Sequence, residues 1–182
     1  APMLRVTSAT DADALIEEIQ LGNEGIVGFD RRGDDLFVAQ SIQRGDPGRT
    51  GPGGLELGLR TWRFDLSHPP EVRETGRTES WPDPAVTESH SAVSYGYFGT
   101  WGSMTAVYPD ANRLVWCHLT SSGRPTHGIY AVSLAWFGPS KATETTFFPI
   151  RLSANSISAE PRVEVENRGY WGASAPIAEN GM

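Results

Sequence analysis

Residues 91–152 read SAVSYGYFGTWGSMTAVYPDANRLVWCHLTSSGRPTHGIYAVSLAWFGPSKATETTFFPIRL, and they hold 11 of the 18 aromatic residues of the chain. The apolar residues stand in short alternating runs that Pro, Gly and Asn interrupt. Alternation with a period of two is typical of β-strands. The connections between the runs are short, and short connections join antiparallel neighbours. The stretch therefore predicts an antiparallel meander, which we extend over residues 93–166.

The alternation also divides the meander into two faces, because successive side chains of a strand point to opposite sides. On the expected strand 126–137, one face is small and apolar while the other is bulky, so both faces need cover from a helix, another sheet or another subunit. The bulky face of the whole meander collects Tyr95, Tyr97, Trp101, Leu114, Trp116, His118, Tyr130, Val132, Leu134, Trp136, Phe148 and Ile150.

About eight antiparallel strands with one helix suit either a closed barrel or two packed sheets. We favour a mainly β fold, an antiparallel β-barrel of about eight strands with one N-terminal α-helix, because a barrel of that size can enclose one small ligand. A two-layer β-sandwich is the alternative. The bulky aromatic face would then line the interior of the barrel.

The N-terminal part predicts a helix over residues 11–21. Thr10 has the character of an N-cap, with Asp13 three residues later as in a capping box. The apolar residues that follow have the spacing of one helical stripe, and Gly22 is a natural stop. The stripe consists of Ala12, Leu15, Ile16 and Ile19.

The rest of the chain is read as parts of one domain spanning residues 1–182, a length that suits a single core. Apolar runs around a Gly-containing turn predict a hairpin, and Gly- and Pro-rich segments predict loops. The expected segments are a hairpin at 25–43, a Gly/Pro loop at 44–54, a strand at 55–66, a long loop at 67–91 and a C-terminal tail at 167–182.

The net charge of −7 argues against a nucleic-acid partner, because a phosphate backbone would be repelled. The basic residues are 14 Arg and one Lys, an imbalance that GC-rich codons of a bacterial source explain. Lys141 stands in a turn-like Gly-Pro-Ser-Lys segment, whereas Schiff-base chemistry needs a buried amine. We therefore expect no cofactor of that kind, and none of another kind.

Cys117 is the one cysteine, which excludes an intrachain disulfide and any multi-cysteine metal site. The four histidines show no close metal-ligand spacing, so we expect no metal. No apolar run approaches the about 20 residues that cross a bilayer, and the first residues carry no signal-peptide pattern. We expect a cytoplasmic protein without a membrane partner, with secretion after removal of a signal as the alternative.

Three polar residues of the aromatic region are candidate catalytic groups, namely His118, Tyr130 and Glu144, since each can donate or accept a proton. Cys117 is expected to be an inert core residue, because it faces away from the adjacent His118. The candidate ligand-binding residues are the large aromatic ones, which would line an apolar cavity. They are Tyr95, Tyr97, Trp101, Trp116, Trp136 and Phe148.

Two functions fit these features. The first is binding of a small hydrophobic molecule in an aromatic cavity, extended to a cofactor-independent cyclase or isomerase that acts through shape and acid–base groups. The second is a protein- or carbohydrate-interaction module, lectin-like, immunity or structural, without catalysis. A homodimer is compatible with both. The sequence contains no motif that identifies a reaction.

Overall fold

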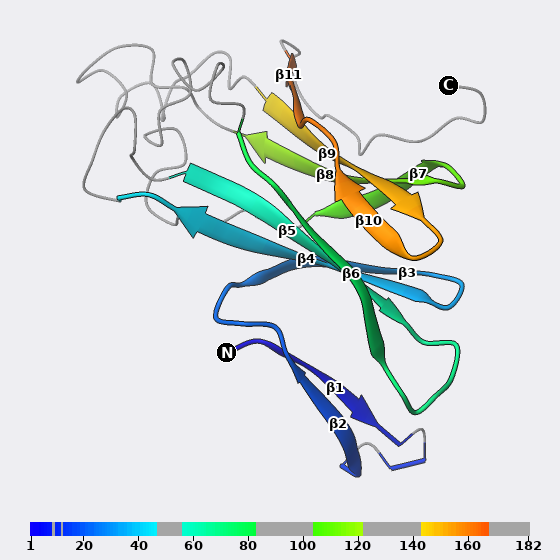
Figure 1. The fold of residues 1–182 in the computed structure, drawn as a ribbon. Coiled ribbons are helices and arrows are strands. Elements are labelled where there is room, and N and C mark those ends of the chain that lie inside the picture. The colour runs from blue at the N-terminus through cyan, green and yellow to red at the C-terminus, as the bar shows by residue number, and fades with distance from the viewer. Residues whose placement is uncertain (9, 12, 47–55, 83–103, 122–142, 168–182) are drawn as a thin grey trace.

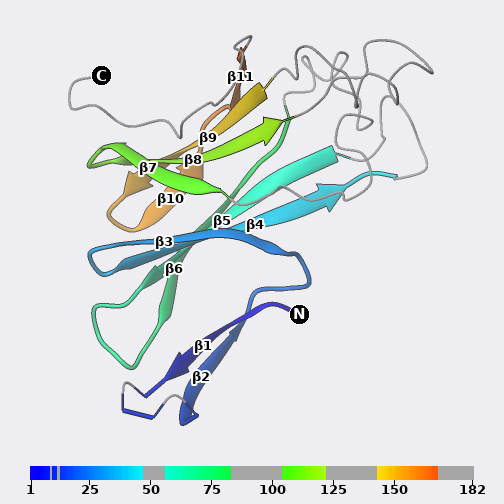
Figure 2. The same cartoon turned by 180° about the vertical axis from the view of Figure 1, so that it is seen from behind.

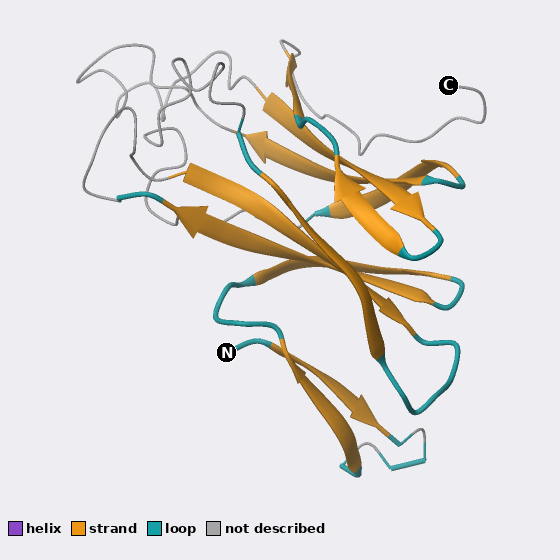
Figure 3. Ribbon diagram, in the orientation of Figure 1, coloured by secondary structure: helices purple, strands orange, loops and turns teal. Residues whose placement is uncertain are grey.

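A computed structural model gives the fold of this chain. The residues that it describes form antiparallel β-sheets and contain no helix (Figure 3). The mainly β, antiparallel class is therefore confirmed. The described residues are 1–8, 10–11, 13–46, 56–82, 104–121 and 143–167.

The N-terminal residues form an antiparallel hairpin of β1 (Met3–Thr7) and β2 (Leu15–Gln20). The helix predicted over 11–21 is wrong. The polar residues before β2 make a turn instead, in which the backbone N–H of Asp13 donates to Oδ1 of Asp11 at 3.0 Å. Asp side chains favour such turns as readily as helix caps.

Packing explains why a strand replaces the helix. Ile19 packs against a buried cluster that contains Val38 and Trp62 of the neighbouring sheet, and alternation along β2 places Glu17 on the same face. Leu15 and Ile16, which a helical stripe would bury, are 52% and 49% exposed. Pairing with β1 and burial of alternate residues thus override the local helical pattern.

The first large sheet is a meander of β3 (Ile26–Arg32), β4 (Asp35–Arg44), β5 (Glu56–Asp65) and β6 (Arg73–Ser80), in that order (Figure 1). The expected hairpin at 25–43 and strand at 55–66 are present. The long loop expected at 67–91 is wrong in part, because it contains β6. This strand is almost entirely polar, and ion pairs such as Arg60–Glu79 at 2.8 Å support its pairing with β5.

The second large sheet contains β7 (Thr105–Asp110), β8 (Arg113–Ser121), β9 (Thr143–Ser153) and β10 (Ser156–Ala159). β11 (Val163–Asn167) also pairs with β9, beyond the end of β10. The described part of the predicted meander is therefore antiparallel as expected. The strand expected at 126–137 lies outside the described residues, as do most of the expected 44–54 loop and the C-terminal tail.

The main core lies between the two large sheets. On β8, Leu114 and Trp116 are fully buried, and they face Ile150 and Phe148 of β9 in the strand register. These are the residues that the alternation assigns to one bulky face, so that part of the prediction is confirmed. The first sheet contributes Phe37, Ala39, Leu57 and Leu59 to the same core.

The sheets approach each other at both edges but form no closed barrel in the described part of the chain. On one side the N–H of Met104 donates to the carbonyl of Val27 at 2.8 Å. On the other side the N–H of Ala159 donates to Oγ1 of Thr78 at 2.9 Å. A barrel needs a continuous ladder of backbone hydrogen bonds around its wall, whereas the described residues show one backbone–backbone bond at the first seam and a backbone–side chain bond at the second. The predicted barrel is therefore replaced by separate sheets.

The hairpin β1–β2 lies on the side of the β3–β6 sheet away from the second large sheet and contacts part of that face (Figures 1 and 2). A second buried cluster lies there and joins Leu21, after the hairpin, to Val38, Trp62 and Phe64. The β3–β6 sheet thus has apolar cover on both faces. The β7–β11 sheet has such cover on the face toward the main core.

Candidate functional site

The outer face of the β7–β11 sheet has an apolar area as well, with charged residues at one end of it. Alternation along β8 sends Val115 and Cys117 to the side opposite Trp116, and the neighbouring strand β9 adds Phe147 and Pro149 to that side. A sheet with water on one face ordinarily carries polar residues there. This face is therefore built to contact something other than water.

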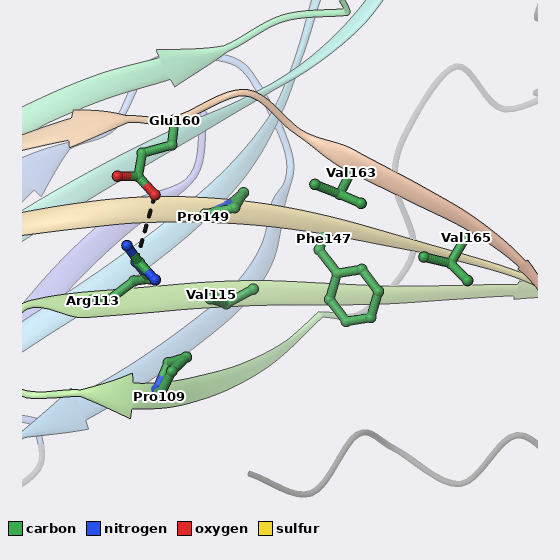
Figure 4. Close-up of a pocket in the computed structure, with 8 residues that line it drawn as sticks. All are labelled: Pro109, Arg113, Val115, Phe147, Pro149, Glu160, Val163 and Val165. Atoms are coloured by element: carbon green, nitrogen blue, oxygen red, sulfur yellow. Dashed lines mark ion pairs between the residues drawn. The ribbon is translucent and has the colours of Figure 1, made fainter. Parts of the chain in front are cut away.

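A shallow groove of about 350 Å³ lies over this face and is widely open to solvent, and Figure 4 shows the residues that line it. Its lining is almost wholly apolar, and the residues come from four strands and the segment between β10 and β11. They are Pro109, Arg113, Val115, Phe147, Pro149, Glu160, Val163 and Val165.

Strand β11 forms one wall of the groove. Val163 pairs with Phe147 of β9, and both Val163 and Val165 point toward the groove (Figure 4). These two valines are 49% and 42% exposed, among the most exposed large apolar side chains of the described chain. Exposed apolar residues that line one concave surface mark an interaction site more strongly than scattered ones.

The groove has a charged end and an apolar end. Arg113 and Glu160 lie at one end and Val165 lies at the other (Figure 4). Nε of Arg113 is 3.5 Å from Oε2 of Glu160, while Arg151 donates from Nε and Nη2 to Oε1 of Glu160 at 3.0 and 2.8 Å. Two guanidinium groups share the Glu160 carboxylate, and the exposed Asp110 is the cross-strand partner of Arg113.

A second pocket, of about 340 Å³, is polar and lies where three turns meet. There Arg63 donates from Nε and Nη2 to both carboxylate oxygens of Asp35 at 2.8 Å, and from Nη1 to the carbonyl of Ser153 at 2.6 Å. The chain itself thus engages every nitrogen of this guanidinium. The network ties the β3–β4 turn to the β9–β10 turn, which is a structural role.

The described part of the predicted catalytic set is His118, which is 5% exposed. Burial lowers the pKa of its imidazole below the ordinary value of 6.5, so the side chain is neutral at pH 7. Glu144 lies in β9, where it pairs with Thr120, while Thr146 pairs with His118. Tyr130 and the side chain of Glu144 lie outside the described residues, so the catalytic set stays a prediction.

Among the predicted ligand-binding residues, Trp116 and Phe148 are fully buried between the sheets. Nε1 of Trp116 donates to Oγ1 of Thr61 at 3.2 Å. Neither aromatic residue lines the groove or the polar pocket. The remaining candidates fall outside the described part of the chain, and they are Tyr95, Tyr97, Trp101 and Trp136.

Cys117 is buried, and burial raises the pKa of its thiol to about 11. A thiol with such a pKa is protonated at pH 7 and is a poor nucleophile. Alternation along β8 places it on the face opposite His118. Both observations agree with the prediction that these neighbours form no catalytic dyad.

The pH dependence of stability tests the environment of His118. The unfolded chain binds a proton near pH 6.5, whereas the native imidazole binds one only at lower pH. The free energy of unfolding therefore falls as the pH drops below about 6.5, by at most about 1.4 kcal/mol per pH unit for one proton. We expect His118→Gln to flatten this slope in urea titrations between pH 5 and 7.5.

The matched control replaces the exposed His68 with Gln, which removes a histidine outside the core. It should leave the wild-type slope unchanged. A wild-type slope in His118→Gln would show that the buried imidazole does not contribute to the acid sensitivity.

The sequence prediction missed the groove. Two features of the sequence could have indicated it: Val163 and Val165 alternate with glutamates, and Val115 continues the apolar outer face.

Within the described residues, no three His, Cys, Asp or Glu side chains gather as a metal site would require. The same part of the chain has no helix of the length and apolar character needed to span a membrane.

Comparison with known proteins gives no relative: no family model, no curated protein and no solved structure matches this chain significantly.

Proposed function

We propose that this chain is a protein-interaction module that binds an extended apolar segment of a partner protein in the groove beside β11. The observation that carries the proposal is the open apolar groove between Val163 and Val165 on one wall and Val115 on the other. Its lining residues lie along and across neighbouring strands, so an extended peptide can contact them with alternate side chains (Figure 4). Apolar side chains of the partner would be removed from water on binding.

The shape of the groove favours a peptide over a small molecule. Small-molecule pockets bury most of the ligand surface, about 70–90%, whereas this groove is widely open to solvent. A bound peptide can leave its other face in water. Trp116 and Phe148 fill the described core instead of lining a cavity, which further supports this choice.

The order of the strands supports this arrangement. β9 pairs with both β8 and β11, so it lies between them and contributes Phe147 and Pro149 to the floor of the groove. A peptide that lies over β9 would contact apolar side chains of all three strands, and burial of these contacts would supply affinity.

Small-molecule binding, with acid–base chemistry by His118, Tyr130 and Glu144, is a second proposal. It is supported by the neutral, buried imidazole of His118. We rank it second because the described part of its site is a filled core.

A substitution in the groove tests the first proposal. We expect Val165→Glu to weaken the binding of extended apolar peptides about tenfold or more, because it removes an apolar contact and places a charge in the groove. Val165 is 42% exposed, so the variant should fold. Peptides selected from a displayed random library would be synthesised with a fluorophore, and their dissociation constants measured by anisotropy.

The matched control is Ile16→Glu, which alters a β-branched residue of similar exposure, 49%, in the N-terminal hairpin. This variant should retain wild-type affinity. If the library yields no peptide that distinguishes wild type from Val165→Glu, the groove is not a peptide-binding site.

A further inference from the structure

The charged end of the groove identifies the kind of peptide that would bind there. We infer that the bound segment presents an acidic side chain to Arg113 and apolar side chains at the second and fourth positions from it along the peptide. This inference rests on the proposed function. It assigns specificity to the charged end of the groove and affinity to the apolar remainder.

The spacing of the lining residues fixes the pattern. On β8, Arg113 and Val115 are two residues apart and face the groove together, and Val163 and Val165 have the same spacing on β11. A strand exposes every second side chain on one face. An extended peptide parallel to these walls would therefore bring its alternate side chains into the groove, one of them at the charged end.

Arg113 is suited to receive a carboxylate. Its contact with Glu160 is 3.5 Å long and involves Nε, whereas Arg151 makes two shorter contacts with the same carboxylate. The side chain of Arg113 is 43% exposed. A guanidinium has five N–H donors and binds a carboxylate through two parallel hydrogen bonds. Arg113 can therefore accept a peptide carboxylate while Arg151 continues to hold Glu160.

A basic side chain fits this end less well. The one acidic side chain in the lining is Glu160, which two arginines already contact and which is 22% exposed. A peptide cation would compete with both arginines and would approach Arg113 at the same time. Because Glu160 is already engaged and Arg113 is partly exposed, an acidic group fits beside Arg113 better than a second cation does, although the chain as a whole carries −7.

The overall negative charge does not prevent this contact. At 0.15 M ionic strength, charges separated by more than about 8 Å are largely screened, whereas a contact pair is screened much less. The peptide carboxylate would lie within hydrogen-bond distance of Arg113. Its preference over a neutral side chain should decrease at higher salt, as for other partly exposed ion pairs.

The test compares three peptides, with Glu, Gln or Lys at X in X-Ser-Val-Ser-Val, and the same three in the reverse order Val-Ser-Val-Ser-X, all capped at both ends and labelled with a fluorophore. For the wild-type protein we expect, in at least one order, the Glu peptide to bind about tenfold more tightly than the Gln peptide, with the Lys peptide weakest. Arg113→Gln should abolish the difference between Glu and Gln. Arg113→Glu should reverse the order and favour Lys.

The matched control is Arg73→Gln, since Arg73 is an exposed arginine of the other sheet with one long ion pair, 3.8 Å, to Asp65. It should preserve the preference for Glu. If the three peptides bind equally well in both orders and Val165→Glu still weakens all of them, the proposed function stands and this inference is overturned. If neither these peptides nor those selected from the library bind, both are overturned. A concentration-dependent dimer that Val165→Glu dissociates would identify a second copy as the occupant and would also overturn both.

Discussion

We expect Trp116→Ala to lower the free energy of unfolding by about 4 kcal/mol, the middle of the range for a buried aromatic residue replaced by alanine. Trp116 is fully buried and packs between the two large sheets. Its loss would leave a cavity in contact with both sheets. It would also remove the N–H donor that contacts Oγ1 of Thr61, which lies in the same buried layer.

Urea unfolding followed by circular dichroism would measure this effect. Trp81→Ala is the matched control, because Trp81 is partly exposed and packs at the sheet surface, 4.3 Å from Arg44 in a cation–π contact. We expect it to cost about 1 kcal/mol. Equal losses in the two variants would contradict the placement of Trp116 at the centre of the core.

The pattern of buried residues in β8 and β9 was predictable because it is local. Alternation alone assigns Leu114 and Trp116 to one face, and the register pairs them with Ile150 and Phe148 as expected. Alternation does not show whether the strands close into a barrel, however, because a barrel and two packed sheets bury the same alternate residues. The predicted barrel therefore failed while the predicted core in these strands was confirmed.

The N-terminal helix and β6 failed for a different reason. The segment 11–21 satisfies a helical stripe, but Leu21 and Ile19 find their partners on a sheet surface that includes Val38 and Trp62. The polar sequence of β6 resembles a loop, and its pairing depends on β5. In both cases contacts with another sheet or strand decide the structure, and these contacts cannot be read from the residues of the segment alone.

The groove could not be predicted because its parts come together only through strand register. Val115, Phe147 and Val163 belong to three different strands, and β11 reaches β9 beyond the end of β10. Arg113 and Glu160 are far apart in sequence yet form an ion pair at the groove end. The sequence shows that each residue is apolar or charged; only the pairing of the strands shows that they share one surface.

The second large effect is expected at Gln40, a fully buried polar residue of β4. Its Oε1 accepts a hydrogen bond from Nε1 of Trp62, and its Nε2 donates to the carbonyls of Leu21 and Glu24 at 2.9 and 3.0 Å. These bonds attach the segment after the N-terminal hairpin to the first large sheet. Gln40→Leu introduces an apolar side chain of similar size and leaves the indole N–H of Trp62 and the two carbonyls without the amide of Gln40 as a partner. We expect a loss of about 3 kcal/mol in the free energy of unfolding.

A double-mutant cycle shows whether the hydrogen bonds cause that loss. Trp62→Phe removes the indole N–H, so Gln40→Leu should cost about 1 kcal/mol less in the Trp62→Phe background than in the wild type. Gln43→Leu, at an exposed position of the same strand, controls for the change of residue type and should stay within about 0.5 kcal/mol of the wild type. Additive losses in the cycle would mean that Gln40 contributes through its volume, because an acceptor of the indole N–H must couple to it.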